Sequence, residues 1–269
     1  MTRLPFDVYL DHLEADSARF AEVLDGADQA AMVPACPEWS AFDLAHHLAE
    51  VQHFWTQVVS RRLADGEQVE AIEAPARPER YADCVALVRD TSDLLLQALR
   101  STAPETPAWT WSNEQSVGFT YRRQAHEALI HRLDAEQVAG TPTPLPAALS
   151  ADGVDEILRI VYGGCPPWGT ITPTPRRTLR LRCSDTGHSW LVTMATFTGD
   201  EPGGEEHVEE PDIHIAETDD GSDVRATITS TAADLDAWLW HRVGDDSIEF
   251  EGDETLLAEL RQVVHQGIN

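Results

Sequence analysis

The sequence predicts a four-helix bundle followed by a smaller α+β domain. Three observations support this fold class. Four long segments in the first half carry apolar residues at helical spacing. A proline-rich run at residues 141–146 then interrupts the chain. Beyond it the pattern changes to short alternating stretches separated by turn residues, which indicates strands. We therefore place the two domains at residues 1–145 and 146–269.

The helices of the first domain are delimited by glycine and proline. The first ends before Gly26, and the second begins at Trp39 or Ser40 after a segment, residues 33–39, that its two prolines predict to be a loop. Prolines also occupy the breaks before the third and fourth helices. The predicted helices are residues 6–25, 40–63, 80–99 and 119–138.

The second domain mixes helices and strands. Predicted helices cover residues 151–162, 232–242 and 253–265. Predicted strands cover residues 178–183, 189–194, 213–215, 224–229 and 247–251. The acidic segment 199–210 is expected to be a solvent-exposed excursion, because so many like charges disfavour a buried position.

Composition places the chain among globular proteins. Its 269 residues are 42% hydrophobic, which is enough for a core. No apolar run reaches the roughly 18 residues of a membrane span, and no signal peptide is visible, so we expect a cytoplasmic protein. The four cysteines are widely spaced, as in a protein with reduced thiols.

Charge narrows the range of partners. The formal net charge is −28, and such a surface repels nucleic acid and anionic membranes, so we exclude both as partners. We expect small-molecule partners and a monomer or homodimer. Every basic side chain other than histidine is arginine, which is typical of a GC-rich source such as an actinobacterium or a halotolerant organism.

The second predicted helix carries three histidines on different faces. His46 and His53 fall on its polar side, which we expect to face solvent. His47 falls in the apolar seam with Leu44 and Val51, so it should point toward the bundle centre. A single histidine in that position is also compatible with a hydrogen-bonded core residue.

The fourth predicted helix supplies the other candidate ligands. Glu127 and His131 lie one turn apart on one face, and apolar or small residues fill most of the rest. A carboxylate on such a buried helix needs a partner. Together with His47, this pair forms a His₂Glu set with an open fourth position. That set suits a catalytic Zn²⁺, and Ni²⁺ or Fe²⁺ would accept the same ligands.

Three runs resemble the mycothiol-dependent maleylpyruvate isomerase family. They are CPEWSAFDLAHHLAEVQHFW at 36–55, YRRQAHEALIHRLDAE at 121–136 and LDAWLWHRVGDDSIEFEGDETLLAEL at 235–260. The resemblance covers nearly the whole chain. It implies a DinB-like metal-binding four-helix bundle followed by a C-terminal domain that resembles sterol carrier proteins.

The resemblance also implies chemistry. The positions that match the family's metal ligands are His47, Glu127 and His131. The implied cofactor is a divalent metal, with Zn²⁺ first among the candidates, and the implied cosubstrate is the thiol mycothiol. The expected function is S-transfer or thiol-assisted isomerisation of a small electrophile. The alternative is a metal-stabilised ligand-binding or regulatory protein without catalysis.

An anionic substrate would need a cation in this acidic protein. Arg242 matches a functional arginine of the resembling isomerases, which makes it the candidate catalytic residue. It would also suit the dipole at a helix C-terminus. His241 departs from the small residue expected before this arginine. Arg122, Arg123 and Arg132 are further candidates, for which we expect surface ion pairs.

Aromatic and thiol side chains complete the candidates. Trp39, Trp109 and Trp111 lie near the starts of the second and fourth predicted helices. They could line the mouth of a binding cleft or pack in the core. Cys36 has no neighbouring histidine in the sequence to activate it, so we expect a structural thiol.

Overall fold

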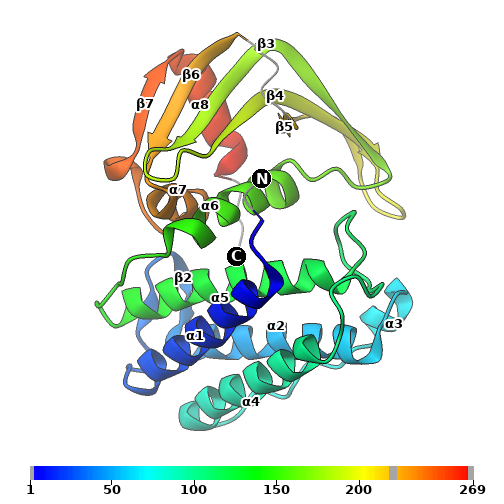
Figure 1. Cartoon of the computed structure of the whole chain (residues 1–269), viewed down its shortest axis with the longest axis vertical. Helices are drawn as coiled ribbons and strands as arrows, with labels where there is room; N and C mark the ends of the chain where they lie inside the picture. The colour runs from blue at the N-terminus through cyan, green and yellow to red at the C-terminus, as the bar shows by residue number, and fades with distance from the viewer. Residues whose placement is uncertain (1–2, 218–222, 266–269) are drawn as a thin grey trace. The chain divides into compact units, whose positions relative to one another are not determined.

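The computed structural model describes residues 3–217 and 223–265, and these divide into two compact units (Figure 1). One unit is helical and spans Leu4–Pro144, and the other begins at Leu145 and is built around a β-sheet. The fold class is therefore the predicted one, a helical bundle followed by an α+β domain.

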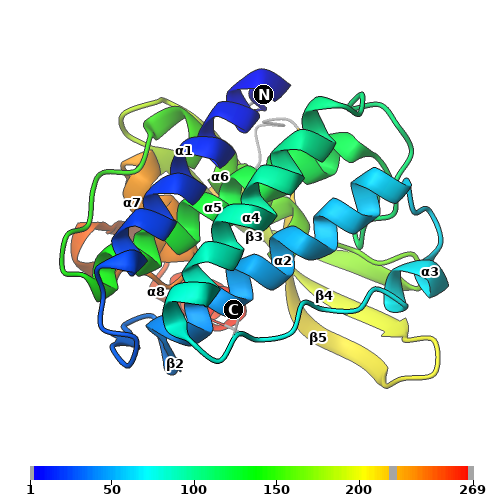
Figure 2. The same cartoon turned by 90° about the horizontal axis from the view of Figure 1, so that it is seen from below.

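Four long helices form the first unit. They are α1 (Phe6–Asp25), α2 (Ala41–Arg61), α4 (Tyr81–Arg100) and α5 (Val117–Val138), with the short α3 (Gly66–Glu70) between α2 and α4. Helix α1 packs against α5 and α4, and α2 packs against α4 and α5. Figure 2 shows these helices side by side from below. These bounds agree with the predicted helices to within about three residues.

Helix α5 is the central helix of the bundle. Every residue from Val117 to Glu136 is buried except Glu127, which is partly exposed. The prediction that this helix is buried nearly all round is confirmed. Its charged residues therefore lie where they need partners.

The expected loop over residues 33–39 is instead a small β-hairpin, formed by β1 (Met32–Val33) and β2 (Cys36–Ser40). Its prolines do not prevent pairing. One lies in the turn, and Pro37 is exposed on a two-stranded ribbon, where a missing N–H is tolerated. The hairpin leads Trp39 directly to the start of α2.

The second unit has a five-stranded mixed sheet in the order β5-β4-β3-β6-β7. Strands β3 and β6 are parallel, and the other neighbours are antiparallel. The strands are β3 (Gly169–Cys183), β4 (Ser189–Asp200), β5 (Glu206–Ile215), β6 (Val224–Ser230) and β7 (Glu249–Gly252). The helical elements are α6 (Ala147–Glu156), the π-helix η1 (Ile157–Tyr162), α7 (Ala232–Leu239), the 3₁₀ turn η2 (Asp245–Ser247) and α8 (Glu254–Val264).

Several strands are longer than the sequence indicates. Strand β3 starts at Gly169 rather than at 178. The register of its pairing with β4 shifts between Pro173 and Thr178, where the strand accommodates its prolines. The acidic segment 199–210 is largely strand, because β4 runs to Asp200 and β5 begins at Glu206. Pairing with β4 satisfies the backbone there while the acidic side chains stay exposed.

Two predicted helices have different ends. The helix expected at 151–162 begins at Ala147 and changes to the π-helix η1 after Glu156. The helix expected at 232–242 ends at Leu239, and His241 adopts a left-handed backbone conformation with φ of 61°. The chain therefore turns just before Arg242.

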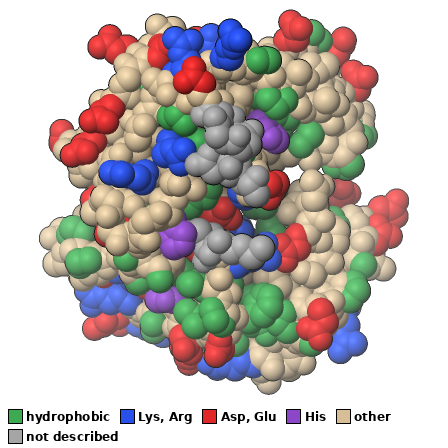
Figure 3. Space-filling model, turned by 45° about the horizontal axis from the view of Figure 1, so that its top comes forward, with side chains coloured by type: hydrophobic (Ala, Val, Ile, Leu, Met, Phe, Trp, Pro, Cys, Tyr) green, Lys and Arg blue, Asp and Glu red, His purple; other side chains and the backbone are tan. Residues whose placement is uncertain are grey.

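Acidic side chains are spread over the face drawn in Figure 3, with basic ones between them. Within the part of the chain that the structure describes, no helix combines the length and the apolar character needed to cross a bilayer.

Candidate metal centre

Three side chains from two helices converge in the helical unit. His47 comes from α2, and Glu127 and His131 come from α5; their ligand atoms all lie within 4.8 Å of one another. Oε1 of Glu127 lies 3.2 Å from Nε2 of His131 and 3.4 Å from Nε2 of His47. The structure thus brings together the three residues that the sequence indicated.

Local structure fixes where these side chains begin. Ser40 caps α2: its hydroxyl accepts from the backbone N–H of Asp43, whose carboxylate accepts from the backbone N–H of Ser40. This capping box sets the first turn of the helix that carries His47. On α5, the spacing of four residues stacks Glu127 and His131 on one face.

A second layer of residues holds these ligands. Nδ1 of His131 donates to Oδ2 of the buried Asp134 over 2.9 Å, because an ionised carboxylate can only accept. With Nδ1 engaged in that bond, Nε2 is the nitrogen of His131 that would bind a metal after losing its proton. Arg123 donates to Oε2 of Glu127 over 2.5 Å, so Oε1 is the oxygen that faces the two histidines.

Sequence reasoning missed Asp134 as a partner and placed Arg123 on the surface. Both lie on the same side of α5 as the ligands, at i+3 from His131 and i−4 from Glu127. That spacing was the available signal, but acids and arginines at these intervals are also common on exposed helices.

The charges of Glu127 and His131 on α5 shift each other's pKa. Burial by itself would raise the pKa of Glu127, but the positive charges of His131 and Arg123 hold it well below its usual range. Burial would lower the pKa of His131, but the charge of Glu127 and the hydrogen bond to Asp134 raise it to about 9. Without metal, the imidazole therefore keeps its proton at neutral pH, and a metal ion must displace that proton.

The residues fit a divalent metal ion. Nε2 of His47 is buried and has no hydrogen-bond partner among the described residues, although it faces Glu127. Tetrahedral Zn²⁺ with bonds of about 2.0–2.1 Å places neighbouring ligand atoms about 3.4 Å apart. Two of the three ligand-atom separations, 3.2 and 3.4 Å, agree with that spacing, and all three lie within 4.8 Å. Three protein ligands would leave a fourth position for another molecule.

Of the three tryptophans singled out, Trp39 lies beside the site. Its ring centroid is 4.6 Å from that of His47 and 6.4 Å from that of His131. Trp109 packs against residues 54 and 55 instead, and Trp111 contacts Phe119. Those contacts lie about two helical turns from the ligands. Cys36 is buried and forms no disulfide among the described residues, which agrees with a structural thiol.

The other arginines are not where the sequence placed them. Arg122, Arg123 and Arg132 are all buried, so the expectation of surface ion pairs was wrong. The reason is the central position of α5, which the charge pattern does not reveal. Arg242 is buried in the α+β unit, where its Nη1 donates to the backbone carbonyl of Trp240. Its functional role remains a prediction.

The remaining histidines of α2 lie outside the ligand group. Nδ1 of His46 lies 3.2 Å from Oε2 of Glu50, one turn further along the helix. His53 is partly exposed. Neither belongs to the group of side chains that could hold a metal in the described chain.

Family models match both units. The mycothiol maleylpyruvate isomerase N-terminal domain matches residues 10–136, and the C-terminal domain of the same family matches residues 148–259. The chain belongs to the mycothiol maleylpyruvate isomerase family. All three candidate ligands fall within the match to the N-terminal domain.

Solved structures support this family's fold for the chain. A crystal structure of mycothiol-dependent maleylpyruvate isomerase matches with 13% identity and a TM-score of 0.53, covering 93% of this chain and 95% of the other. A histidine-to-alanine mutant of that isomerase matches with 14% identity, the same TM-score and the same coverage. At this identity the likeness establishes the fold. No curated relative matches the sequence.

Proposed function

We propose that this family member is a metal-dependent enzyme that uses a low-molecular-weight thiol, mycothiol, in S-transfer or cis–trans isomerisation of a small electrophile. The observation that carries the proposal is the convergence of His47, Glu127 and His131 with one position left open. A His₂Glu set of this kind suits catalytic Zn²⁺. The matched isomerase structures are of a mycothiol-dependent enzyme, which favours a thiol as the fourth ligand.

A divalent ion held there would lower the pKa of a coordinated thiol, so that it reacts as a thiolate near neutral pH. In isomerisation, the sulfur would add to one carbon of an activated alkene, the resulting single bond would rotate, and the sulfur would leave with its electron pair. In S-transfer, the sulfur would displace a leaving group and remain on the product.

The chain's own residues prepare this chemistry. Asp134 holds the His131 ring with Nε2 toward Glu127, and Arg123 balances part of the carboxylate charge. Trp39 supplies an apolar wall against His47. Arg242 is the proposed partner for a substrate carboxylate or a developing negative charge, which a protein of net charge −28 would otherwise repel.

Substitution of Co²⁺ into the full-length protein tests the proposal. Mycothiol should add a sulfur-to-cobalt charge-transfer band and should be consumed with an activated alkene or halide. The rate should stay level down through pH 7, whereas the rate of a free thiol of pKa about 8.5 falls. Arg242→Ala should lower turnover and leave the metal content unchanged.

The opposite result is equally specific. An unaltered cobalt spectrum at saturating mycothiol, together with no thiol consumption, would contradict the enzyme. The alternative, a metal-stabilised ligand-binding or regulatory protein, would then account for the site.

A further inference from the structure

Two polar side chains of α5 are buried without partners. Gln124 and Thr120 are completely buried. Neither the amide nitrogen nor the amide oxygen of Gln124 has a hydrogen-bond partner within the described chain, and the hydroxyl of Thr120 has none either. Buried polar groups are nearly always paired in folded proteins, so each exception requires an explanation such as a water or a ligand.

These side chains continue the row of metal-ligand candidates. Residues 120, 124, 127 and 131 are spaced by four, three and four positions, which places them on one stripe of a helix with 3.6 residues per turn. With a rise of about 1.5 Å per residue, Gln124 lies about 4.5 Å from Glu127 along the helix axis, and Thr120 about 10 Å. The stripe therefore leads away from the metal centre in one direction.

Helix α2 contacts α5 near both ends of this stripe. At one end of the stripe, His47 of α2 lies beside Glu127 and His131. Further along, Trp55 of α2 packs against Phe119, which precedes Thr120, with ring centroids 5.9 Å apart. Along the axis of α5, Gln124 and Thr120 therefore lie between the metal centre and Phe119, which contacts Trp55.

A second buried glutamine shows how the bundle treats a structural amide. Gln52 of α2 is also completely buried, but its Nε2 donates to Ser17 over 2.9 Å and its Oε1 accepts from Ser92 over 2.6 Å. The chain therefore supplies both partners to Gln52 and neither to Gln124. Gln124 is the only amide side chain in the described residues with both polar atoms buried and unpaired.

We infer that Gln124 and Thr120 recognise an uncharged amide or hydroxyl group of the same molecule whose sulfur binds at the metal centre. The inference rests on the proposed function, because it takes the metal-bound end of that molecule to be a thiol. A side-chain amide presents one acceptor and two donors, and a secondary amide complements both kinds. The short spacing between Gln124 and Glu127 favours an amide only a few bonds from the sulfur.

This assignment distinguishes two classes of thiol. A simple alkyl thiol would reach the metal but leave the polar atoms of Gln124 and Thr120 unpaired, which costs binding free energy. A thiol with an amide two carbons from sulfur would pair them. The protein should therefore select acylaminoethyl thiols over alkyl thiols of the same length.

The test uses two probe thiols and three variants of the full-length Co²⁺ protein. N-acetylcysteamine carries the amide, and 1-pentanethiol replaces it with methylenes. Gln124→Met and Thr120→Val remove polar atoms at nearly constant volume, and Gln52→Met is the matched control. Dissociation constants come from titration of the cobalt spectrum, and melting temperatures are measured for each protein.

Wild-type protein should bind N-acetylcysteamine about tenfold more tightly than 1-pentanethiol, as expected for one or two net hydrogen bonds. Gln124→Met should abolish that preference, and Thr120→Val should reduce it. Neither should lower the melting temperature, since each removes a buried polar atom that the protein itself leaves unpaired. Gln52→Met should keep the preference and lower the melting temperature.

Three results would overturn the inference. An unchanged preference in Gln124→Met and Thr120→Val, with both thiols still bound, would mean that a structural water alone satisfies these groups. If Gln124→Met lowered the melting temperature as much as Gln52→Met does, Gln124 would have a structural role. If neither thiol alters the wild-type cobalt spectrum, the proposed function fails and the inference fails with it.

Discussion

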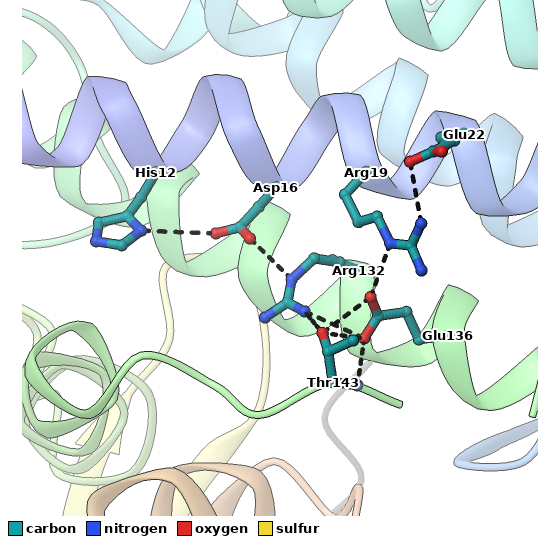
Figure 4. Close-up of polar contacts among 7 residues, drawn as sticks. All are labelled: His12, Asp16, Arg19, Glu22, Arg132, Glu136 and Thr143. Atoms are coloured by element: carbon teal, nitrogen blue, oxygen red, sulfur yellow. Dashed lines mark hydrogen bonds and ion pairs between the residues drawn. The ribbon is translucent and has the colours of Figure 1, made fainter. Parts of the chain in front are cut away.

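Two clusters of charged side chains lie on different faces of α5. One is the metal centre around Glu127 and His131. The other, which we term the ion network, links α5 to α1 and to the segment that follows α5 (Figure 4). It consists of Asp16, Arg19, Arg132, Glu136 and Thr143.

The ion network consists of carboxylates that face arginines. Glu136 accepts from Arg19 over 3.0 Å, from Arg132 over 3.1 Å and from the backbone N–H of Thr143 over 2.8 Å. Arg132 also lies 2.8 Å from Asp16. Each carboxylate in the network thus has an arginine within ion-pair distance, although Oδ2 of Asp16 and Nε of Arg132 have no hydrogen-bond partner among the described residues.

The metal centre is built differently. Its three ligand atoms approach one another, and Nε2 of His47 has no hydrogen-bond partner among the described residues. The comparison teaches that buried charge by itself does not identify a site on α5. What separates the two clusters is the kind of partner: the carboxylates of the ion network face arginines, which cannot bind a metal, whereas Oε1 of Glu127 faces two histidine nitrogens.

The largest expected effect concerns the ion network. Glu136→Ala would leave Arg132 and Arg19 without their common partner, and removal of one partner from a buried pair costs about 3–5 kcal/mol. We expect that loss in the free energy of unfolding, measured with denaturant, while the metal content stays the same. Loss of metal without a decrease in the free energy of unfolding would contradict the distinction between the two clusters.

Asp16 should make stability depend on pH. Burial raises its pKa to about 6, outweighing the opposing effect of Arg132. A raised pKa in the folded state stabilises the protein fully below the unfolded value of 3.8, and this stabilisation is lost as pH rises through about 6. Relative to Asp16→Asn, wild-type protein should therefore lose about 2 kcal/mol between pH 4 and pH 7, at 1.36 kcal/mol per pKa unit, because part of the loss has already occurred at pH 4.

Unfolding free energies of the two proteins at several pH values would test this expectation. A constant difference between pH 4 and pH 7 would contradict the assigned burial of the Asp16 charge. The metal centre should not contribute to the difference, since both proteins keep its ligands.

For the residues that hold the metal ligands in place, we expect a smaller effect, which is on metal affinity. Asp134→Asn replaces the carboxylate that orients His131 and should weaken metal binding about 10–100-fold. Competition with a chromophoric chelator measures it. Glu50→Gln, which removes the partner of His46 instead, is the matched control and should leave the affinity unchanged.

The comparison also explains what the sequence could predict. The helical periodicity of the sequence predicted that Glu127 and His131 share one face of their helix and that His47 points toward the bundle centre. The family resemblance selected the same three residues. The burial of Arg123 and Arg132 escaped prediction even though their helix was expected to be buried nearly all round, because arginine is rarely buried unless it is paired. Both clusters contain buried carboxylates and arginines, and only the folded chain shows which carboxylate faces two histidines.

The longer strands escaped prediction for a different reason. Residues 199–210 carry mostly acidic and turn-forming residues, so local preference disfavours a strand. Pairing with β4 overrides that preference. Partners supplied by distant parts of the chain decide such segments, and they are not visible in a short window of sequence.

The most direct test of the central claim is the metal content of the full-length protein purified without chelator. We predict about one divalent ion per chain, Zn²⁺ above all, and loss of that ion in His47→Ala, Glu127→Gln and His131→Ala. His46→Ala and His53→Ala should retain it. Retention of the metal when all three predicted ligands are replaced together, or its loss in the two controls alone, would contradict the account.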